Sequence, residues 1–201
     1  MSLATYAAAG YAPVPLRGGH PAVPGILANR AWRHTPGADE SFAGCETGVV
    51  CASRPLSGAS GPATLAAVAS TWVAGIRWET TDRKLSADLA AIVERIAGRS
   101  PTRIDDAEVL RVFKVEAPFD SRRLPPMHFP HERYTALSYR PHRFELLCRA
   151  SWLVVSGGTW KHGALPDVRR NELPTLTPAQ ADQIVSDVGT IFSNRGALPW
   201  M

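Results

Sequence analysis

The sequence predicts an α+β fold, in which a mixed, largely antiparallel sheet has flanking helices. Three observations predict it. Residues 71–114 follow the order strand, helix, strand, residues 134–157 contain three closely spaced strand candidates, and an amphipathic helix begins at Thr177. Apolar residues at helical spacing mark the helices, and short runs of β-branched and aromatic residues mark the strands. We expect both helices to bury their apolar faces on the sheet.

The unit at residues 71–114 is the best-defined part of this pattern. A strand is expected from Trp72 to Thr80, a helix from Asp82 to Ala97, and a second strand from Val109 to Val115. The apolar face of the helix consists of Leu85, Leu89, Ile92, Val93 and Ile96. Asp82 is among the candidate N-caps, and Gly98 stands where a helix-terminating glycine is expected. The unit therefore anchors the predicted sheet.

The C-terminal helix has the clearest boundaries. Thr177 is a suitable N-cap, Pro178 occupies the first helical position, and Gln180 completes a capping box. Its apolar face consists of Ile184, Val185, Val188, Ile191 and Phe192. We expect a helix from Thr177 to Asn194.

The rest of the chain alternates short elements with irregular segments. A short helix is expected at residues 4–9. Further strands are expected at residues 11–16, 47–52, 134–140, 143–148 and 152–157, the last three as an antiparallel meander. Glycine, proline and charged residues dominate residues 17–43 and 116–133, which predicts two long surface loops.

Length, charge and cysteine content limit the class of protein. The length of 201 residues predicts one domain spanning 1–201. The net charge of +4 is compatible with an anionic partner and equally with an ordinary solvated surface. Three cysteines without a CxxC pair predict reduced thiols, and no apolar run is long enough to span a membrane. The N-terminus lacks the basic region of a signal peptide, so we expect a cytoplasmic protein.

The order of several motifs resembles a known family. PLR, GG and HP are followed by TGVV, then by the strand–helix unit leading to SPTRI and LRVFKVEAPF, and then by FELL, VVSGG and LPTLTPAQ. This order is similar to that of the N-terminal primase-polymerase domain of mobile-element replication proteins, within the archaeo-eukaryotic primase superfamily. The resemblance covers most of the chain. It implies a primase-polymerase-like fold and a replication-associated protein of a phage or other mobile element.

The resemblance also implies a metal site. In that family, the strand matching VAGIRWET carries an Asp-x-Asp pair that binds Mg²⁺ or Mn²⁺, because nucleotidyl transfer needs two carboxylates on one side of a strand. Here those positions are Arg77 and Glu79. If catalysis survives, Glu79 and Glu145 in FELL, together with Asp82, are the implied metal ligands. An arginine beside Glu79 is expected to pair with it and to repel a metal ion. A solvated ion pair at Arg77 and Glu79, and a solvent-facing Glu145, are the alternatives.

Positions that hold phosphate in the family are also altered. The family has a glycine- and lysine-rich segment where this chain has Asp105, Asp106 and Glu108. The remaining nucleotide-binding candidates are Arg103, Arg111 and Lys114, with His20 in place of a lysine in the N-terminal glycine turn. Acidic residues thus stand where the resemblance implies basic ones. The site is expected to be degenerate.

A nucleic-acid contact surface is a further prediction from the basic residues of the second half. The nucleic-acid-binding candidates are Arg122, Arg123, Arg140 and Arg143. Such arginines contact phosphates without a metal ion. The sequence therefore favours a degenerate primase-polymerase-like protein that binds nucleotide or DNA, with a replicative helicase as a partner. The alternative is a non-catalytic DNA-binding or protein-interaction module that keeps only the fold.

Overall fold

The computed structural model describes residues 2–22, 42–51, 72–130, 140–149 and 151–200. Its centre is a six-stranded sheet of order β11-β5-β6-β4-β9-β7, in which neighbouring strands are antiparallel. The strands are β4 (Val73–Glu79), β5 (Thr102–Asp105), β6 (Glu108–Lys114), β7 (Arg122–Arg123), β9 (Arg143–Leu147) and β11 (Thr159–Lys161). The fold is α+β with largely antiparallel sheets, as the sequence predicts.

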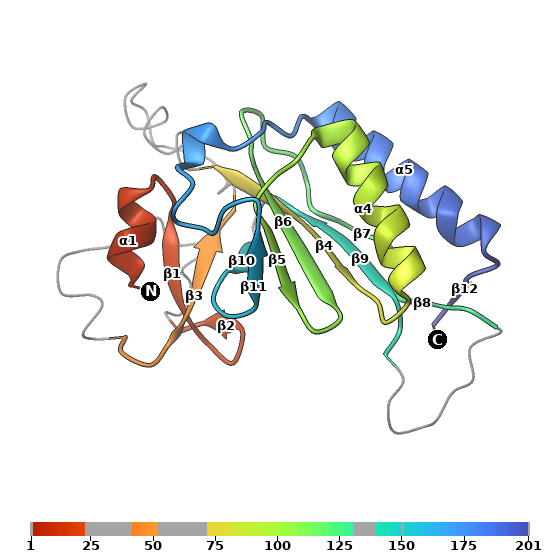
Figure 1. Cartoon of the computed structure of the whole chain (residues 1–201), viewed down its shortest axis with the longest axis horizontal. Coiled ribbons are helices and arrows are strands. Elements are labelled where there is room, and N and C mark those ends of the chain that lie inside the picture. Colours follow the sequence, from red (N-terminus) through yellow and green to blue (C-terminus); the bar gives the residue numbers. More distant parts are fainter. Residues whose placement is uncertain (1, 23–41, 52–71, 131–139, 150, 201) are drawn as a thin grey trace.

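Two long helices, α4 (Arg83–Ala97) and α5 (Pro178–Asn194), lie side by side over one face of this sheet (Figure 1). Asp82 is the N-cap of α4 and accepts hydrogen bonds from two backbone N–H groups of the first turn. At the start of α5, Thr177 and Gln180 form the expected capping box. Both predicted helices are confirmed, because each has its own periodicity and its own caps.

The core between the helices and the sheet is built from alternate residues of β4. Ala74, Ile76 and Trp78 face the helices and are buried. The helix residues that pack there include Leu85, Leu89, Val93, Ile184, Val188 and Phe192. Because side chains alternate along a strand, the residues between them face the opposite side of the sheet.

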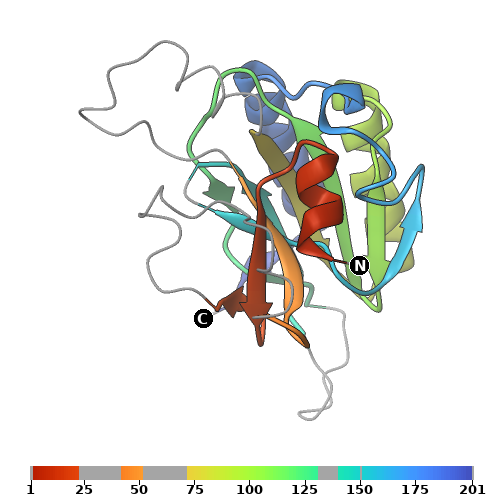
Figure 2. The ribbon, with the colours of Figure 1, turned by 90° about the vertical axis from the view of Figure 1, so that its left-hand side faces the viewer.

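A smaller sheet lies beside one end of the central sheet, on the side away from α4 and α5 (Figure 2). Its strand order is β10-β3-β1-β2. The strands are β1 (Pro13–Arg17), β2 (His20–Pro21), β3 (Glu46–Val50) and β10 (Trp152–Val154), and helix α1 (Leu3–Ala8) precedes β1. Leu153 and Val49 of this sheet share a core with Val73 and Val112 of the central sheet.

The small sheet covers only part of the face of β4 that is turned away from the helices. Gly75 marks the covered part, since a Cβ atom there would lie 2.4 Å from Leu153 Cδ2. Arg77 and Glu79 follow at the next two positions on the same face and are partly exposed. The central sheet therefore has one face divided into an apolar half under the small sheet and a polar half beyond it.

Short elements complete the chain. β8 (Met127–His128) pairs with β12 (Leu198–Pro199), and η1 (Arg170–Glu172) precedes α5. The segment predicted as a loop at residues 116–133 therefore contains the strands β7 and β8. The predicted loop at 17–43 begins with β2, and its residues 23–41 lie outside the described residues.

The predicted meander is wrong. β9 lies in the central sheet between β4 and β7, whereas β10 pairs with β3 in the small sheet. The first predicted strand of the meander falls on residues 134–140, of which only Arg140 is described. The segments of β9 and β10 are close in sequence, which favours pairing between them. In the structure, Leu153 of β10 packs against Gly75 of the central sheet instead, and β10 pairs with β3 in the small sheet.

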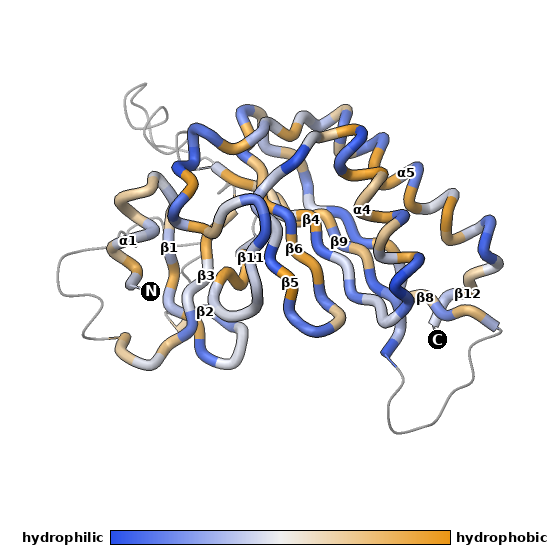
Figure 3. Tube along the Cα trace, viewed as in Figure 1, coloured by the Kyte–Doolittle hydropathy of each residue, from blue (hydrophilic) through white to orange (hydrophobic). Residues whose placement is uncertain are grey.

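β5 and β11 were not predicted. β5 forms a tight hairpin with β6, and Asp106 takes a left-handed conformation at its turn, with φ of 53°. Figure 3 shows this hairpin tip as a hydrophilic segment at the end of the sheet. Asp adopts this conformation at a turn more readily than most residues, so the consecutive Asp105 and Asp106 indicate a turn between β5 and β6.

No helix in the described part of the chain combines the length and apolar character needed to cross a membrane. All three cysteines, Cys45, Cys51 and Cys148, are free thiols. Burial raises the pKa of the Cys51 thiol well above its ordinary value, and the nearby Cys148 adds to this.

The contact at Gly75 gives a stability prediction. Gly75→Ala forces its new methyl group against Leu153 and should lower the free energy of unfolding by about 1–3 kcal/mol, measured by urea denaturation. Gly189→Ala in α5 is the control, because no described atom beyond its own helix and neighbours lies within 4 Å of the new Cβ. It should be neutral or stabilising by up to about 1 kcal/mol. Equal effects of the two substitutions would contradict this packing.

Candidate functional site

The candidate site is the polar half of the central sheet, on the face that the small sheet leaves uncovered. Arg77 on β4 lies directly opposite Glu145 on β9, and Glu79 lies opposite Glu108 on β6 and Arg143 on β9. Residues directly opposite each other on neighbouring strands place their side chains on the same face, about 5 Å apart. The strand register therefore gathers these charged groups from three strands.

Arg77 is placed between two carboxylates. Its Nε donates to Glu145 Oε2 over 3.0 Å, its Nη2 also contacts that oxygen, and its Nη1 lies 3.5 Å from Glu108 Oε2. We expected Arg77 to pair with Glu79, and that expectation is wrong: Glu79 instead lies 3.4 Å from Arg140 Nη1. Residues two apart on a strand are separated by nearly 7 Å, at about 3.4 Å per residue, so a cross-strand partner is closer.

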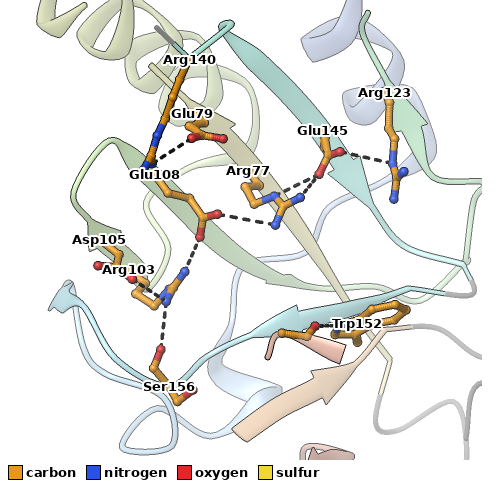
Figure 4. A network of polar contacts seen from close by, with 11 residues as sticks. Arg77, Glu79, Arg103, Asp105, Glu108, Arg123, Arg140, Glu145, Trp152 and Ser156 are labelled. Atoms are coloured by element: carbon orange, nitrogen blue, oxygen red, sulfur yellow. Dashed lines mark hydrogen bonds and ion pairs between the residues drawn. The ribbon is translucent and has the colours of Figure 1, made fainter. Parts of the chain in front are cut away.

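The ion pairs continue on both sides of Arg77 as an alternating row across the sheet (Figure 4). We call this row the arginine–carboxylate ladder. In spatial order it consists of Arg123, Glu145, Arg77, Glu108, Arg103 and Asp105. Arg103 is its most buried member, with 4% of its side chain exposed, and it also donates to the Ser156 carbonyl over 2.9 Å. Each carboxylate in the interior of the ladder thus contacts an arginine on either side.

A cleft of about 500 Å³ lies between the end of the ladder and the rim of the small sheet. It is lined by Glu46, Glu79, Arg103, Asp105, Asp106, Glu108, Arg140, Val154, Ser156 and Gly157. Acidic side chains outnumber the two arginines in this lining. Glu46 also accepts a hydrogen bond from the Gly19 N–H over 3.0 Å, so the N-terminal glycine turn already has an anionic partner. The cleft is therefore not an open cradle for phosphate.

The residues implied as metal ligands are not grouped to hold a metal ion. Glu79 and Glu145 share the open face, but Arg140 contacts the first, and Arg77 and Arg123 contact the second. Asp82 caps α4 and binds Arg195 over 2.9 Å. Partial burial alone would raise the pKa of Asp82, but backbone hydrogen bonds and Arg195 hold it below its ordinary value.

Among the described residues, no group of three or more His, Cys, Asp or Glu side chains is arranged to hold a metal ion. A carboxylate whose oxygens face guanidinium groups must give up those contacts before it can bind a cation. The donor set present on the open face therefore does not fit a two-metal centre.

The four residues predicted to bind nucleotide do not converge. Arg103 belongs to the ladder, but Arg111 faces the helices and lies 3.6 Å from Glu94 of α4. Burial lowers the pKa of Arg111 below its ordinary value. Lys114, at the far end of β6, donates to the Asn171 carbonyl over 2.9 Å.

The fourth, His20, lies in the small sheet, where its ring centroid is 6.2 Å from that of Trp152. It therefore belongs to a different sheet from the other three candidates. Successive side chains of β6 point to opposite faces of the sheet, so Arg111 and Lys114, three residues apart, lie on different faces. His20 is apart from both because its strand, β2, belongs to the small sheet.

The predicted nucleic-acid contacts divide by strand position. Arg122 turns toward the helices and pairs with Asp182 of α5. Arg123 and Arg143 face the open side, and Arg140 reaches it from the chain before β9. All three are exposed, Arg123 by 66% and Arg140 by 63% of the side chain, and Arg143 has no ion-pair partner within the described ranges.

Sequence reasoning missed Glu46 as part of this region, and it named Glu108 only as an acidic residue in a phosphate-holding position, not as a partner of Arg77. The pairing of Glu108 with Arg77 depends on the register of β4 and β6, which no local motif reveals. No protein-family model matches the chain, and no curated protein matches it. The family therefore stays a prediction that rests on the order of motifs.

The contribution of Arg77 to the stability of the ladder can be tested by substitution. Arg77→Met leaves two partly buried carboxylates without their shared cation and should lower the free energy of unfolding at pH 7 by about 1–2 kcal/mol, measured in urea. Arg77→Met combined with Glu145→Gln should lose less than the sum of the two single changes, by about 1 kcal/mol. Additive losses would contradict the bridging role.

Arg95→Met is the matched control for this cycle. Arg95 pairs with Asp187 on the helical side, and 63% of its side chain is exposed. Exposed pairs of this kind contribute little, so the control should change the unfolding free energy by less than about 0.5 kcal/mol.

Proposed function

We propose that this chain is a nucleic-acid-binding, primase-polymerase-like protein of a phage or other mobile element, in which the nucleotidyl-transfer site is degenerate. The order of motifs supports the family. The position of Arg77 between Glu108 and Glu145 carries the second part of the proposal, since it puts a cation where that chemistry needs a carboxylate. Free thiols fit a cytoplasmic location, and a replicative helicase is the proposed partner.

The proposed ligand is the phosphate backbone of a single strand. Arg123 and Arg140 lie 3.4 Å from their carboxylate partners, so these ion pairs are loose, and Arg143 is exposed beside them. A guanidinium has five N–H donors and can contact a phosphate while it keeps a carboxylate partner. Arg77 and Arg103 hold the ladder together, and the three exposed arginines bind phosphate.

In this proposal the interior of the ladder has a second effect on binding. Each carboxylate that approaches the phosphates has an arginine neighbour, so its repulsion of an anion is reduced. Removal of a ladder arginine would therefore weaken binding in two ways, through a lost cation and through an exposed carboxylate. The salt-dependence test alters only the three exposed arginines, Arg123, Arg140 and Arg143, and leaves the interior ladder arginines Arg77 and Arg103 in place.

Salt dependence tests phosphate binding. The logarithm of the binding constant for single strands falls with the logarithm of salt concentration by about 0.7 per phosphate contact, so three arginines should contribute a slope of about −2. Fluorescence anisotropy with a labelled deoxythymidine oligonucleotide measures it. The combined change of Arg123, Arg140 and Arg143 to Gln should remove most of this slope.

The matched control carries the same loss of charge on the other side of the molecule. Arg83, Arg95 and Arg99 are exposed residues of α4 and the turn after it, and changing all three to Gln should leave most of the slope in place. Equal losses in both triple variants would mean that net charge alone governs binding. No salt-dependent binding by the wild type would leave the protein-interaction module as the better interpretation.

A primer-extension assay tests whether catalysis survives. With Mn²⁺ or Mg²⁺, a primed template and nucleotides, the wild type should show no more incorporation than Glu79→Ala, because the carboxylates of the open face contact arginines. Incorporation that requires a metal ion and is lost in Glu79→Ala would overturn the degenerate site.

A further inference from the structure

A row of four charged side chains crosses the open face at the end where β5 and β6 meet in their hairpin. Asp105 on β5 lies opposite Glu108 on β6. Glu108 in turn lies opposite Glu79 on β4, which lies opposite Arg143 on β9. Neighbouring strands are about 4.8 Å apart, so the row is about 14 Å long from the first residue to the last. Its charge changes from negative to positive between β4 and β9.

Two further carboxylates extend the acidic end of this row. Asp106 stands at the exposed turn of the hairpin, and Glu46 of β3 lines the same cleft as the row's carboxylates. Each carboxylate of the row contacts an arginine, whereas neither Glu46 nor Asp106 contacts an arginine or lysine among the described residues. The lining of the cleft holds five carboxylates against two arginines. We call Glu46 and Asp106 the acidic border.

On the other side, the basic part of the open face ends at the edge strand β7. A hollow of about 440 Å³ lies there, lined by Arg123, Leu124, Pro125, Pro126, Arg143 and Glu145. Apart from its two arginines and Glu145, which contacts Arg77 and Arg123, this lining is uncharged. Figure 4 shows Asp105 and Arg123 at opposite ends of the charged region. Arg123 and Arg143 stand on neighbouring strands, so they form a strip that is wide enough for one phosphate backbone but not for two.

A duplex cannot place both of its backbones on such a strip. The grooves between the two backbones of B-form DNA are about 6 Å and about 12 Å wide, so a second backbone would reach the acidic end of a row about 14 Å long. There it would meet uncompensated carboxylates, and beyond β7 it would meet uncharged surface. An unpaired strand has a single backbone, and its uncharged bases can lie on either side of the arginines.

We infer that the acidic border makes this surface selective for unpaired over paired strands. The exposed arginines bind one backbone, and Glu46 and Asp106 repel a second one. These two carboxylates hold no ligand, and their effect is to lower the affinity for the wrong partner, which is a common source of specificity. The inference rests on the proposed phosphate binding and adds two residues that determine which kind of strand is bound.

Neutralising the acidic border tests this inference. Asn adopts the left-handed conformation of residue 106 as readily as Asp, and Gln at position 46 keeps an oxygen that can accept from the Gly19 N–H. The combined variant Asp106→Asn, Glu46→Gln should therefore fold as the wild type does, with the same midpoint of urea unfolding. Because neither carboxylate contacts an arginine, the change releases no cation from the ladder.

Fluorescence anisotropy compares one labelled oligonucleotide of mixed sequence, alone and annealed to its complement. The wild type should bind the single strand more tightly than the duplex. In the combined variant, at about 50 mM salt, the affinity for the duplex should rise about fivefold and that for the single strand by less than about twofold. Each single substitution should produce part of this change.

Two exposed carboxylates at the far end of the central sheet supply the matched control. Glu116 follows the end of β6 that is remote from the hairpin turn. Asp167 follows Lys161, which pairs with Thr102 at the remote end of β5. The combined change of Glu116 to Gln and Asp167 to Asn removes the same charge and should leave the ratio of the two affinities within about twofold of the wild type. An equal gain in duplex affinity in this control would overturn the inference, because net charge alone would then explain it.

Failure of the acidic border is distinguishable from failure of phosphate binding. If the wild type binds the single strand with the expected salt slope but binds the duplex equally well, the acidic border has no such role and phosphate binding stands. The same holds if the combined variant keeps the whole preference of the wild type. If the wild type binds neither form, phosphate binding itself is wrong.

Discussion

The Arg77 guanidinium between Glu108 and Glu145 is the interaction on which the open face of the central sheet depends. Strand register places these two carboxylates on either side of Arg77, where a metal ion or a cationic side chain can hold them together. The chain uses an arginine. As a result, the exposed cations of this surface are the guanidinium groups of Arg123, Arg140 and Arg143, and Glu145 and Glu79 contact the first two.

The same strand also determines where the surface begins. β4 turns Gly75 toward the small sheet and Arg77 toward solvent, on one face and two residues apart. Close approach of Leu153 at Gly75 brings the rim of the small sheet near the ladder, where the Ser156 carbonyl accepts a hydrogen bond from Arg103. The packing of Leu153 on Gly75 and the hydrogen bond from Arg103 to Ser156 therefore mark the same boundary on this face of the sheet, between its apolar half and its polar half.

The long elements were predictable because each carries its own signals. The helices α4 and α5 have apolar periodicity and caps within their own sequences, and β4 and β6 are long apolar runs. β5, β7 and β11 are too short to show a period, and the placement of β10 in the small sheet depends on a tertiary contact rather than on a local pattern.

The site was predicted less well than the fold, for a physical reason. Motif positions identified Glu79, Glu145 and Arg103 as neighbours of one surface, but the partner of each depends on register across four strands. That register pairs Arg77 with Glu145 and leaves Glu79 to Arg140, and it turns Arg111 to the opposite face.

The central claim is that an arginine replaces the metal ion between the carboxylates of the open face. Paramagnetic broadening by Mn²⁺ of the arginine Nε–H signals in an NMR spectrum tests this claim directly, because broadening requires the ion to bind close by. We expect the Arg77 signal to be broadened no more than that of Arg95 on the opposite side of the molecule. Selective broadening at Arg77 would show that the carboxylates bind a metal ion and would contradict this account.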